Sequence, residues 1–240
     1  MAGYLGNNIL PSRAGELIRA VYVGKENNIS TSFSLATGFV ERFIDLLALI
    51  VLGSFALTYS GITSSTIQTA LRVMSVFALV GILLILTAPF FGNRLLKQIS
   101  SITIFKTAAG EKLQLFFQQF LNGLAALNHF RRATLLLIYT SIIWSMDGLG
   151  VVLVSRTVHL DVLLSHAFVL LAGLGLSSAI PSTPGYVGVY QFVAVVVLEP
   201  FGIARPSALA LIIFLQVVNF LVVAFWGGIA VSRASSLTRS

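Results

Sequence analysis

Long apolar stretches constrain this chain more than any other feature of its sequence. A helix needs about 20 mostly apolar residues to cross a bilayer. Six stretches approach or exceed that length: 33–58, 73–91, 133–155, 162–180, 186–199 and 207–232. Only 10% of the 240 residues are charged and 57% are hydrophobic, whereas soluble domains are about 25% charged. The sequence therefore predicts an all-α fold, a polytopic transmembrane helix bundle with about six spans.

The positions of lysine and arginine predict how the bundle is oriented. The connection 92–132 contains six of these residues, whereas 59–72 contains Arg72 alone. Cytoplasmic loops carry an excess of basic residues, so we expect this connection and both termini to be cytoplasmic. The protein would then be a multi-pass protein of the cell (inner) membrane. Stretch 186–199 is short, and if it re-enters instead of spanning, the C-terminal tail changes side.

The connection 92–132 contains a second pattern. Apolar residues recur at helical spacing within 111–128, and most polar residues avoid that stripe. The stripe consists of Leu113, Phe116, Phe117, Phe120, Leu121, Leu124 and Leu127. This pattern predicts an amphipathic helix at the cytoplasmic interface. A helix packed under the bundle is the alternative.

Charge and motif content exclude several classes of function. The net charge is +7, but the basic residues lie mostly between apolar stretches, where the positive-inside rule and anionic lipid head groups explain them. We therefore expect no nucleic-acid partner. The chain has no cysteine and no zinc-protease, serine-hydrolase or P-loop motif. We expect no metal, no cofactor and no enzymatic activity, although intramembrane lipid modification by carboxylates remains an alternative.

Two similar motifs combine proline and glycine. Residues 10–15 read Leu-Pro-Ser-Arg-Ala-Gly, and residues 180–185 read Ile-Pro-Ser-Thr-Pro-Gly. Proline interrupts a helix, and glycine lets the backbone turn. Broken helices at corresponding places in two halves are typical of transporter binding sites. We therefore predict broken or re-entrant helices here, with ordinary cytoplasmic turns as the alternative.

Charged residues occur inside two of the apolar stretches. Glu41, Arg42 and Asp45 share one helical face, and Arg42 can pair with Asp45. Glu41 then requires another partner, for which we expect Arg13 or Arg19. A partly solvated cluster near the head groups is the alternative.

Two further polar features lie in later stretches. Asp147 has no basic neighbour within one turn and is expected to face the bundle interior. Gln216 and Asn219 are expected to bridge helices.

Three motifs together resemble a known family. They run from Asn7 to Arg19, from Glu41 to Asp45, and from Pro181 to Gly188. In this order they resemble the transmembrane flippase-like family, also called the lysylphosphatidylglycerol synthase transmembrane-region family, over nearly the whole chain. The resemblance implies one transmembrane domain over residues 1–240, without a synthase domain. The family usually has about two more helices before the first motif, so we expect N-terminal helices to be missing here.

The resemblance and the misplaced charges together imply a function. We expect a lipid translocase for a phospholipid or aminoacyl-phospholipid, with anionic membrane lipids as partners. The alternative is a non-catalytic membrane partner of a lipid or cell-envelope glycan synthesis enzyme, and a second copy of the chain is another candidate partner. The residues expected to bind or move the lipid are Asn7, Pro11, Arg13, Glu16, Arg19, Glu41, Arg42, Asp45, Asp147, Pro181, Pro184, Gly185 and Gly188.

Overall fold

The computed structural model is mainly helical in the part of the chain that it describes. That part comprises residues 14–26, 29–59, 107–125, 130–178 and 183–237, together with isolated positions between 69 and 87. No strand occurs within these ranges. The predicted all-α fold is therefore confirmed.

The described residues form a series of helices along the chain. In chain order they are α2 (Ala14–Glu26), α3 (Thr31–Tyr59), α5 (Ala108–Ala125), α6 (Phe130–Thr157), α7 (Leu164–Ser178), the 3₁₀ turn η4 (Pro184–Tyr186), α8 (Val189–Leu198), the 3₁₀ turn η5 (Glu199–Phe201) and α9 (Arg205–Leu237). The predicted stretches 33–58, 133–155, 162–180, 186–199 and 207–232 fall mainly on α3, α6, α7, α8 and α9. Most of 73–91 lies outside the described residues.

The described helices differ in length and in how apolar they are. Among the residues that the structure describes, three segments are long and apolar enough to cross a membrane, namely Thr134–Thr157, Pro184–Phe201 and Arg205–Ile229. The second reaches its length by including both 3₁₀ turns, because α8 itself has 10 residues. Helix α7 is apolar but has 15 residues, while α3 has 29. The number of spans therefore stays a prediction.

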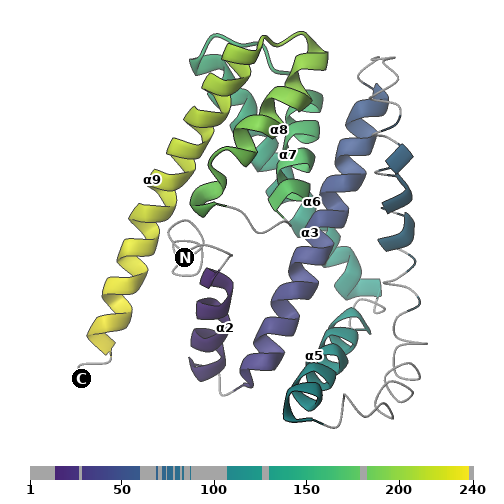
Figure 1. The fold of residues 1–240 in the computed structure, drawn as a ribbon, viewed down its shortest axis with the longest axis vertical. Helices are drawn as coiled ribbons and strands as arrows, with labels where there is room; N and C mark the ends of the chain where they lie inside the picture. The colour runs from purple at the N-terminus through teal and green to yellow at the C-terminus, as the bar shows by residue number, and fades with distance from the viewer. Residues whose placement is uncertain are drawn as a thin grey trace.

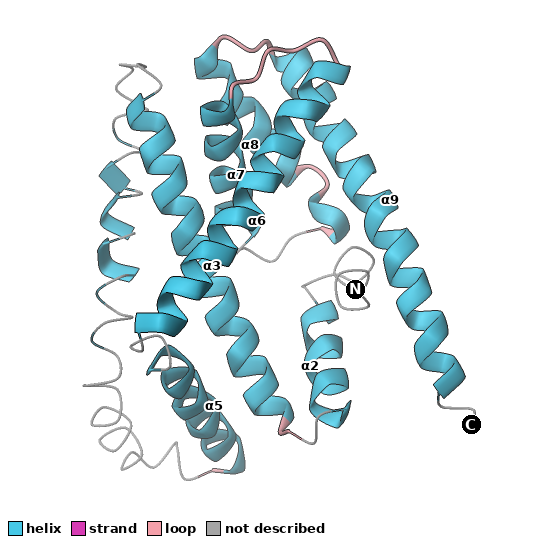
Figure 2. Ribbon diagram, turned by 180° about the vertical axis from the view of Figure 1, so that it is seen from behind, coloured by secondary structure: helices cyan, strands magenta, loops and turns pink. Residues whose placement is uncertain are grey.

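The connections define two ends of the bundle. Figure 1 shows the links from α6 to α7 and from α8 to α9 at its upper end, which we call the loop end (residues 158–163 and 202–204). Helices α2 and α5 lie at the opposite end, the α5 end, and α9 runs down to that end as well (Figures 1 and 2). The C-terminal end of α9 and helix α5 thus lie at the same end of the bundle. Which side is cytoplasmic stays a prediction.

Close helix packing forms the centre of the bundle. Helices α3 and α7 run side by side, and a Cβ placed on Gly175 would lie 2.5 Å from Leu49 Cδ1. A second contact joins α3 to α7 nearer the loop end, through Ala56, Leu57 and Val169. A buried apolar cluster formed by Leu170, Leu198 and Leu211 among others joins α7, α8 and α9. The absence of a side chain at Gly175 therefore lets α3 and α7 approach.

Helix α5 packs on α3 through one side and is exposed on another. Its rings of Phe116 and Phe120 pack edge-on against Phe39 and Phe43 of α3. In contrast, Leu113, Leu115 and Phe117 remain exposed. The helix is therefore docked on the bundle and also presents an apolar edge.

The α3–α7 contact gives a stability prediction. Gly175→Leu inserts a branched side chain where Leu49 already sits, and such overpacking costs about 1–3 kcal/mol. We expect a lower apparent Tm for the detergent-purified protein, followed by size-exclusion chromatography after heating. Gly150→Leu is the matched control, because its added Cβ has no described atom within 4 Å apart from its chain neighbours and the backbone of its own helix. Equal Tm values for the two variants would contradict this packing.

Candidate functional site

The charged cluster lies at the middle of a long helix. Asp45 is fourteen residues from both Thr31 and Tyr59, the two ends of α3, which corresponds to about 21 Å on either side. Arg42 and Glu41 lie one turn closer to the α5 end. This depth disfavours a cluster confined to the end of the helix.

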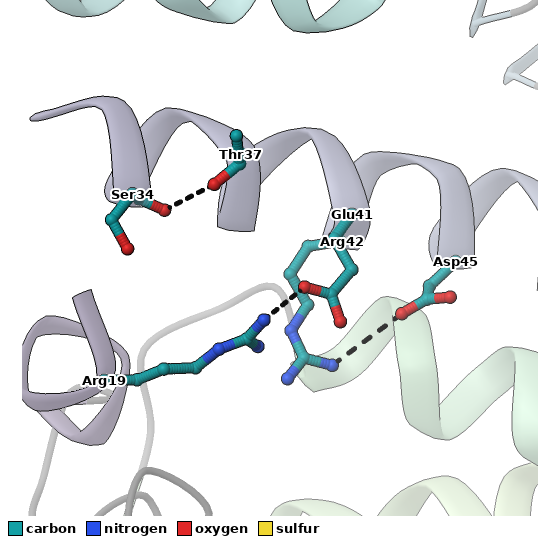
Figure 3. A network of polar contacts seen from close by, with 6 residues as sticks. All are labelled: Arg19, Ser34, Thr37, Glu41, Arg42 and Asp45. Carbon is teal, nitrogen blue, oxygen red and sulfur yellow. Dashed lines mark hydrogen bonds and ion pairs between the residues drawn. The ribbon is translucent and has the colours of Figure 1, made fainter. Parts of the chain in front are cut away.

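An ion pair joins α2 to this cluster. The Arg19 Nη2 donates to Glu41 Oε2 across 2.6 Å (Figure 3). Both side chains are a little over 40% exposed. The expected pairing of Glu41 with an N-terminal arginine is therefore confirmed, with Arg19 as the partner. This contact fixes α2 against the middle portion of α3.

A second pair forms within α3 itself. Arg42 Nη1 lies 3.9 Å from Asp45 Oδ2 (Figure 3), and both side chains are about two-thirds buried. The predicted i,i+3 pair is therefore present. Arg19 of α2 therefore meets α3 at Glu41, next to Arg42. Each of the two arginines is paired with a carboxylate of α3.

Helix α6 brings two more groups toward Asp45. Both the Asp147 carboxylate and the Trp144 indole are close enough to interact electrostatically with Asp45. The Trp144 Nε1 is buried without a regular hydrogen bond to any described residue. The Asp147 side chain is exposed, although its carboxylate lies within electrostatic range of Asp45 on α3. The expectation that Asp147 faces the bundle interior stays a prediction. Asp147 adds a further acidic group to the cluster.

The second Pro-Gly motif forms a non-helical turn. We call residues 183–188 the hairpin tip, because they lie between the short helices α7 and α8 in the chain. Gly185 has φ 63° and Gly188 has φ 90°, values that glycine adopts without steric cost. Tyr186, between them, has φ 57°. The backbone is therefore non-helical at Gly185 and Gly188.

Two glutamines hold the hairpin tip. The Gly188 N–H donates to Gln191 Oε1 across 2.6 Å, and Gln191 Nε2 donates to Gln216 Oε1 across 2.6 Å. Gln216 Nε2 then donates to the carbonyl oxygen of Gly185 across 2.9 Å. Gln216 thus bridges helices as expected. Gln191 was not singled out from the sequence, although a glutamine three residues after a helix start is a known capping signal.

The hairpin tip and the charged cluster lie at similar depth. Gln216 is the twelfth residue of α9, about 16 Å from the loop end by helical rise, and Figure 2 shows the turn at mid-height. On α3, Asp45 lies one turn below Leu49, while Ser178 ends α7 about one turn below Gly175. Since Leu49 and Gly175 are in contact, Asp45 lies level with the end of α7.

The remaining predicted residues cannot be placed in the site. Asn7, Pro11, Arg13 and Pro181 lie outside the described residues. Glu16 lies on α2 one turn before Arg19, and nothing further is described of its side chain. The similarity of the two Pro-Gly motifs therefore stays a prediction.

Long apolar helices with charges at mid-length define a polytopic helical membrane protein. Comparison with protein families places the chain more closely: the model of the lysylphosphatidylglycerol synthase TM region matches residues 1–227, and the chain belongs to this family.

Two proteins from archaea are similar to this chain. The chain is 28% identical to the UPF0104 membrane protein MJ1078 of Methanocaldococcus jannaschii, covering 93% of this chain and 91% of the relative. It is 27% identical to the glycosyltransferase AglD of Haloferax volcanii, covering 85% of this chain but 37% of AglD. No solved structure matches the chain.

The Arg19–Glu41 pair predicts how α2 is held. Glu41→Gln removes the charge that Arg19 contacts, and an exposed pair of this kind contributes about 0.2–1 kcal/mol. We expect faster amide hydrogen exchange in 14–26, by up to about fivefold, measured by mass spectrometry. Glu199→Gln is the control, because it breaks the Arg205–Glu199 pair at the loop end instead. Unchanged exchange in Glu41→Gln would show that the pair does not hold α2.

Proposed function

We propose that this membrane protein moves a lipid with an anionic head group between leaflets. The observation that carries the proposal is the pair of carboxylate-held arginines, Arg19 and Arg42, beside the midpoint of α3. Charged groups at such depth are costly and are usually retained for a substrate or ion pathway. A lipid head group is the substrate that a protein in the bilayer meets most often.

The chemistry of the cluster suits a phosphate-containing head group. A guanidinium has five N–H donors in a fixed fork, so it can bind a carboxylate and phosphate oxygens together. Glu41 and Asp45 orient the two arginines. With Asp147 they also provide negative charge for an amine on the same head group. This arrangement supports a phospholipid or an aminoacyl-phospholipid as cargo.

The interrupted helix supports passage through the bundle. Helices α7 and α8 have 15 and 10 residues, about 22 and 15 Å long, so each is shorter than the about 30 Å hydrocarbon core. Non-helical backbone at membrane depth is tolerated where protein or a water-filled cavity surrounds it. We therefore infer a re-entrant hairpin whose tip provides polar backbone beside the charged cluster.

A second candidate function rests on a different observation. The chain resembles 37% of the length of AglD, which is named a glycosyltransferase. This region could therefore serve as the membrane partner of a separate glycan or lipid synthesis enzyme, without moving lipid itself. That function predicts a stable complex with such an enzyme, whose activity does not depend on Arg42.

The translocase proposal predicts a transport defect. Charged hydrogen bonds contribute about 1.5–3 kcal/mol, so we expect Arg42→Gln to slow transbilayer movement at least tenfold. The measurement is the exposure of a labelled anionic phospholipid to an external quencher in proteoliposomes. Arg205→Gln is the control, because Arg205 is highly exposed and pairs with Glu199 at the loop end.

Two results would contradict this proposal. Equal rates for Arg42→Gln and Arg205→Gln would remove the cluster from the pathway. No protein-dependent movement of any labelled lipid would contradict translocation itself. A co-purifying synthesis enzyme with normal activity in the Arg42→Gln background would then favour the partner function.

A further inference from the structure

The side chain of Gln216 in α9 reaches the hairpin tip. Gln216 accepts a hydrogen bond from Gln191 and donates one to the Gly185 carbonyl. Around these amides the contacts between α8 and α9 are apolar, through residues such as Ala194, Leu198 and Leu211. The polar link between the tip and α9 is thus local and separable from the apolar packing of the two helices.

The two glutamines form a chain of hydrogen bonds in which each amide accepts one bond and donates the next. It begins at the Gly188 N–H, passes through the amides of Gln191 and Gln216, and ends at the Gly185 carbonyl. Both ends are backbone groups that the interrupted helix leaves without helical partners. An unsatisfied backbone group in hydrocarbon costs several kcal/mol, so this chain stabilises the turn where it lies.

We propose that Gln216 is a positioning residue, which acts through Gln191 to hold the hairpin tip level with the Arg42–Asp45 pair. The assignment of the tip to a lipid pathway rests on the proposed function, whereas the positioning itself does not. Gln216 fixes the depth of the tip because α9 runs from the loop end to the α5 end (Figure 1). The contact therefore ties the position of the short hairpin to α9, a helix that continues past the tip.

The backbone around the tip allows it to move as a unit when this contact is lost. Gly185 and Gly188 lie at its turning points, with positive φ. The rings of Tyr186 and Tyr190 stack at 4.7 Å with planes 7° apart, which links the tip to the first turn of α8. Loss of the Gln216 amide should therefore displace the tip together with the start of α8, while the apolar contacts of α8 nearer the loop end stay in place.

Paired spin labels measure this displacement directly. Because the chain has no cysteine, Val187→Cys and Leu221→Cys provide two unique thiols, on the tip and on α9. Both positions are about 60% exposed, so labels fit there. In the otherwise unchanged protein in nanodiscs, double electron–electron resonance should give one narrow distance distribution.

Removal of the bridging amide should broaden or shift that distribution. Gln216→Met keeps an unbranched side chain but removes both hydrogen bonds. Gln191→Met breaks the same chain at its other member, so it should have the same effect, and the double variant should add little to either change. If Gln216→Met fails to fold, Gln191→Met alone carries the test.

Asn219→Met is the matched control. Asn219 is an amide one turn further along α9, is exposed, and makes no hydrogen bond to any described residue. Its replacement should leave the distance distribution unchanged. A narrow, unshifted distribution in both glutamine variants would overturn the positioning role, as would an equal change in Asn219→Met.

Lipid exposure measured in the same variants tests the link to transport separately. A displaced tip with slower movement of the labelled phospholipid supports both the positioning role and the pathway. A displaced tip with an unchanged rate leaves the positioning role intact and contradicts the placement of the tip in the pathway.

Discussion

Polar groups at mid-depth must find partners within the protein, and this requirement organises the structure. Hydrocarbon offers no hydrogen bonds, so a charge or a broken helix inside the bundle is costly unless another side chain meets it. The chain meets the requirement twice. Arg19 and Arg42 satisfy carboxylates on α3, and Gln191 with Gln216 satisfies the backbone of the hairpin tip.

These two arrangements depend on the same helix packing. Gly175 lets α7 approach Leu49 of α3 closely, and this contact sets the end of α7 level with Asp45. The polar tip and the charged cluster therefore lie on neighbouring helices at similar depth, although their residues are more than a hundred positions apart. A head group that entered from either leaflet would meet both, which is why we place the proposed pathway between them.

The sequence predicted those features that follow from local pattern or from a single strong cost. Apolar length predicted the helices, and the isolated charge of Glu41 predicted an arginine partner. Other features needed the three-dimensional arrangement. Gln191 and Gln216 are 25 residues apart and carry no charge, so nothing local links them. The approach of Asp147 and Trp144 to Asp45 is likewise visible only in the structure, because the residues lie on helices far apart in the sequence.

The central claim is that the arginines of the mid-depth cluster bind a lipid head group. Native mass spectrometry of the protein, released from nanodiscs of mixed anionic and zwitterionic phospholipids, tests it most directly. The account predicts that the wild-type protein retains an anionic phospholipid, that Arg42→Gln loses it, and that Arg205→Gln keeps it. Equal retention of that lipid by all three proteins would contradict the claim.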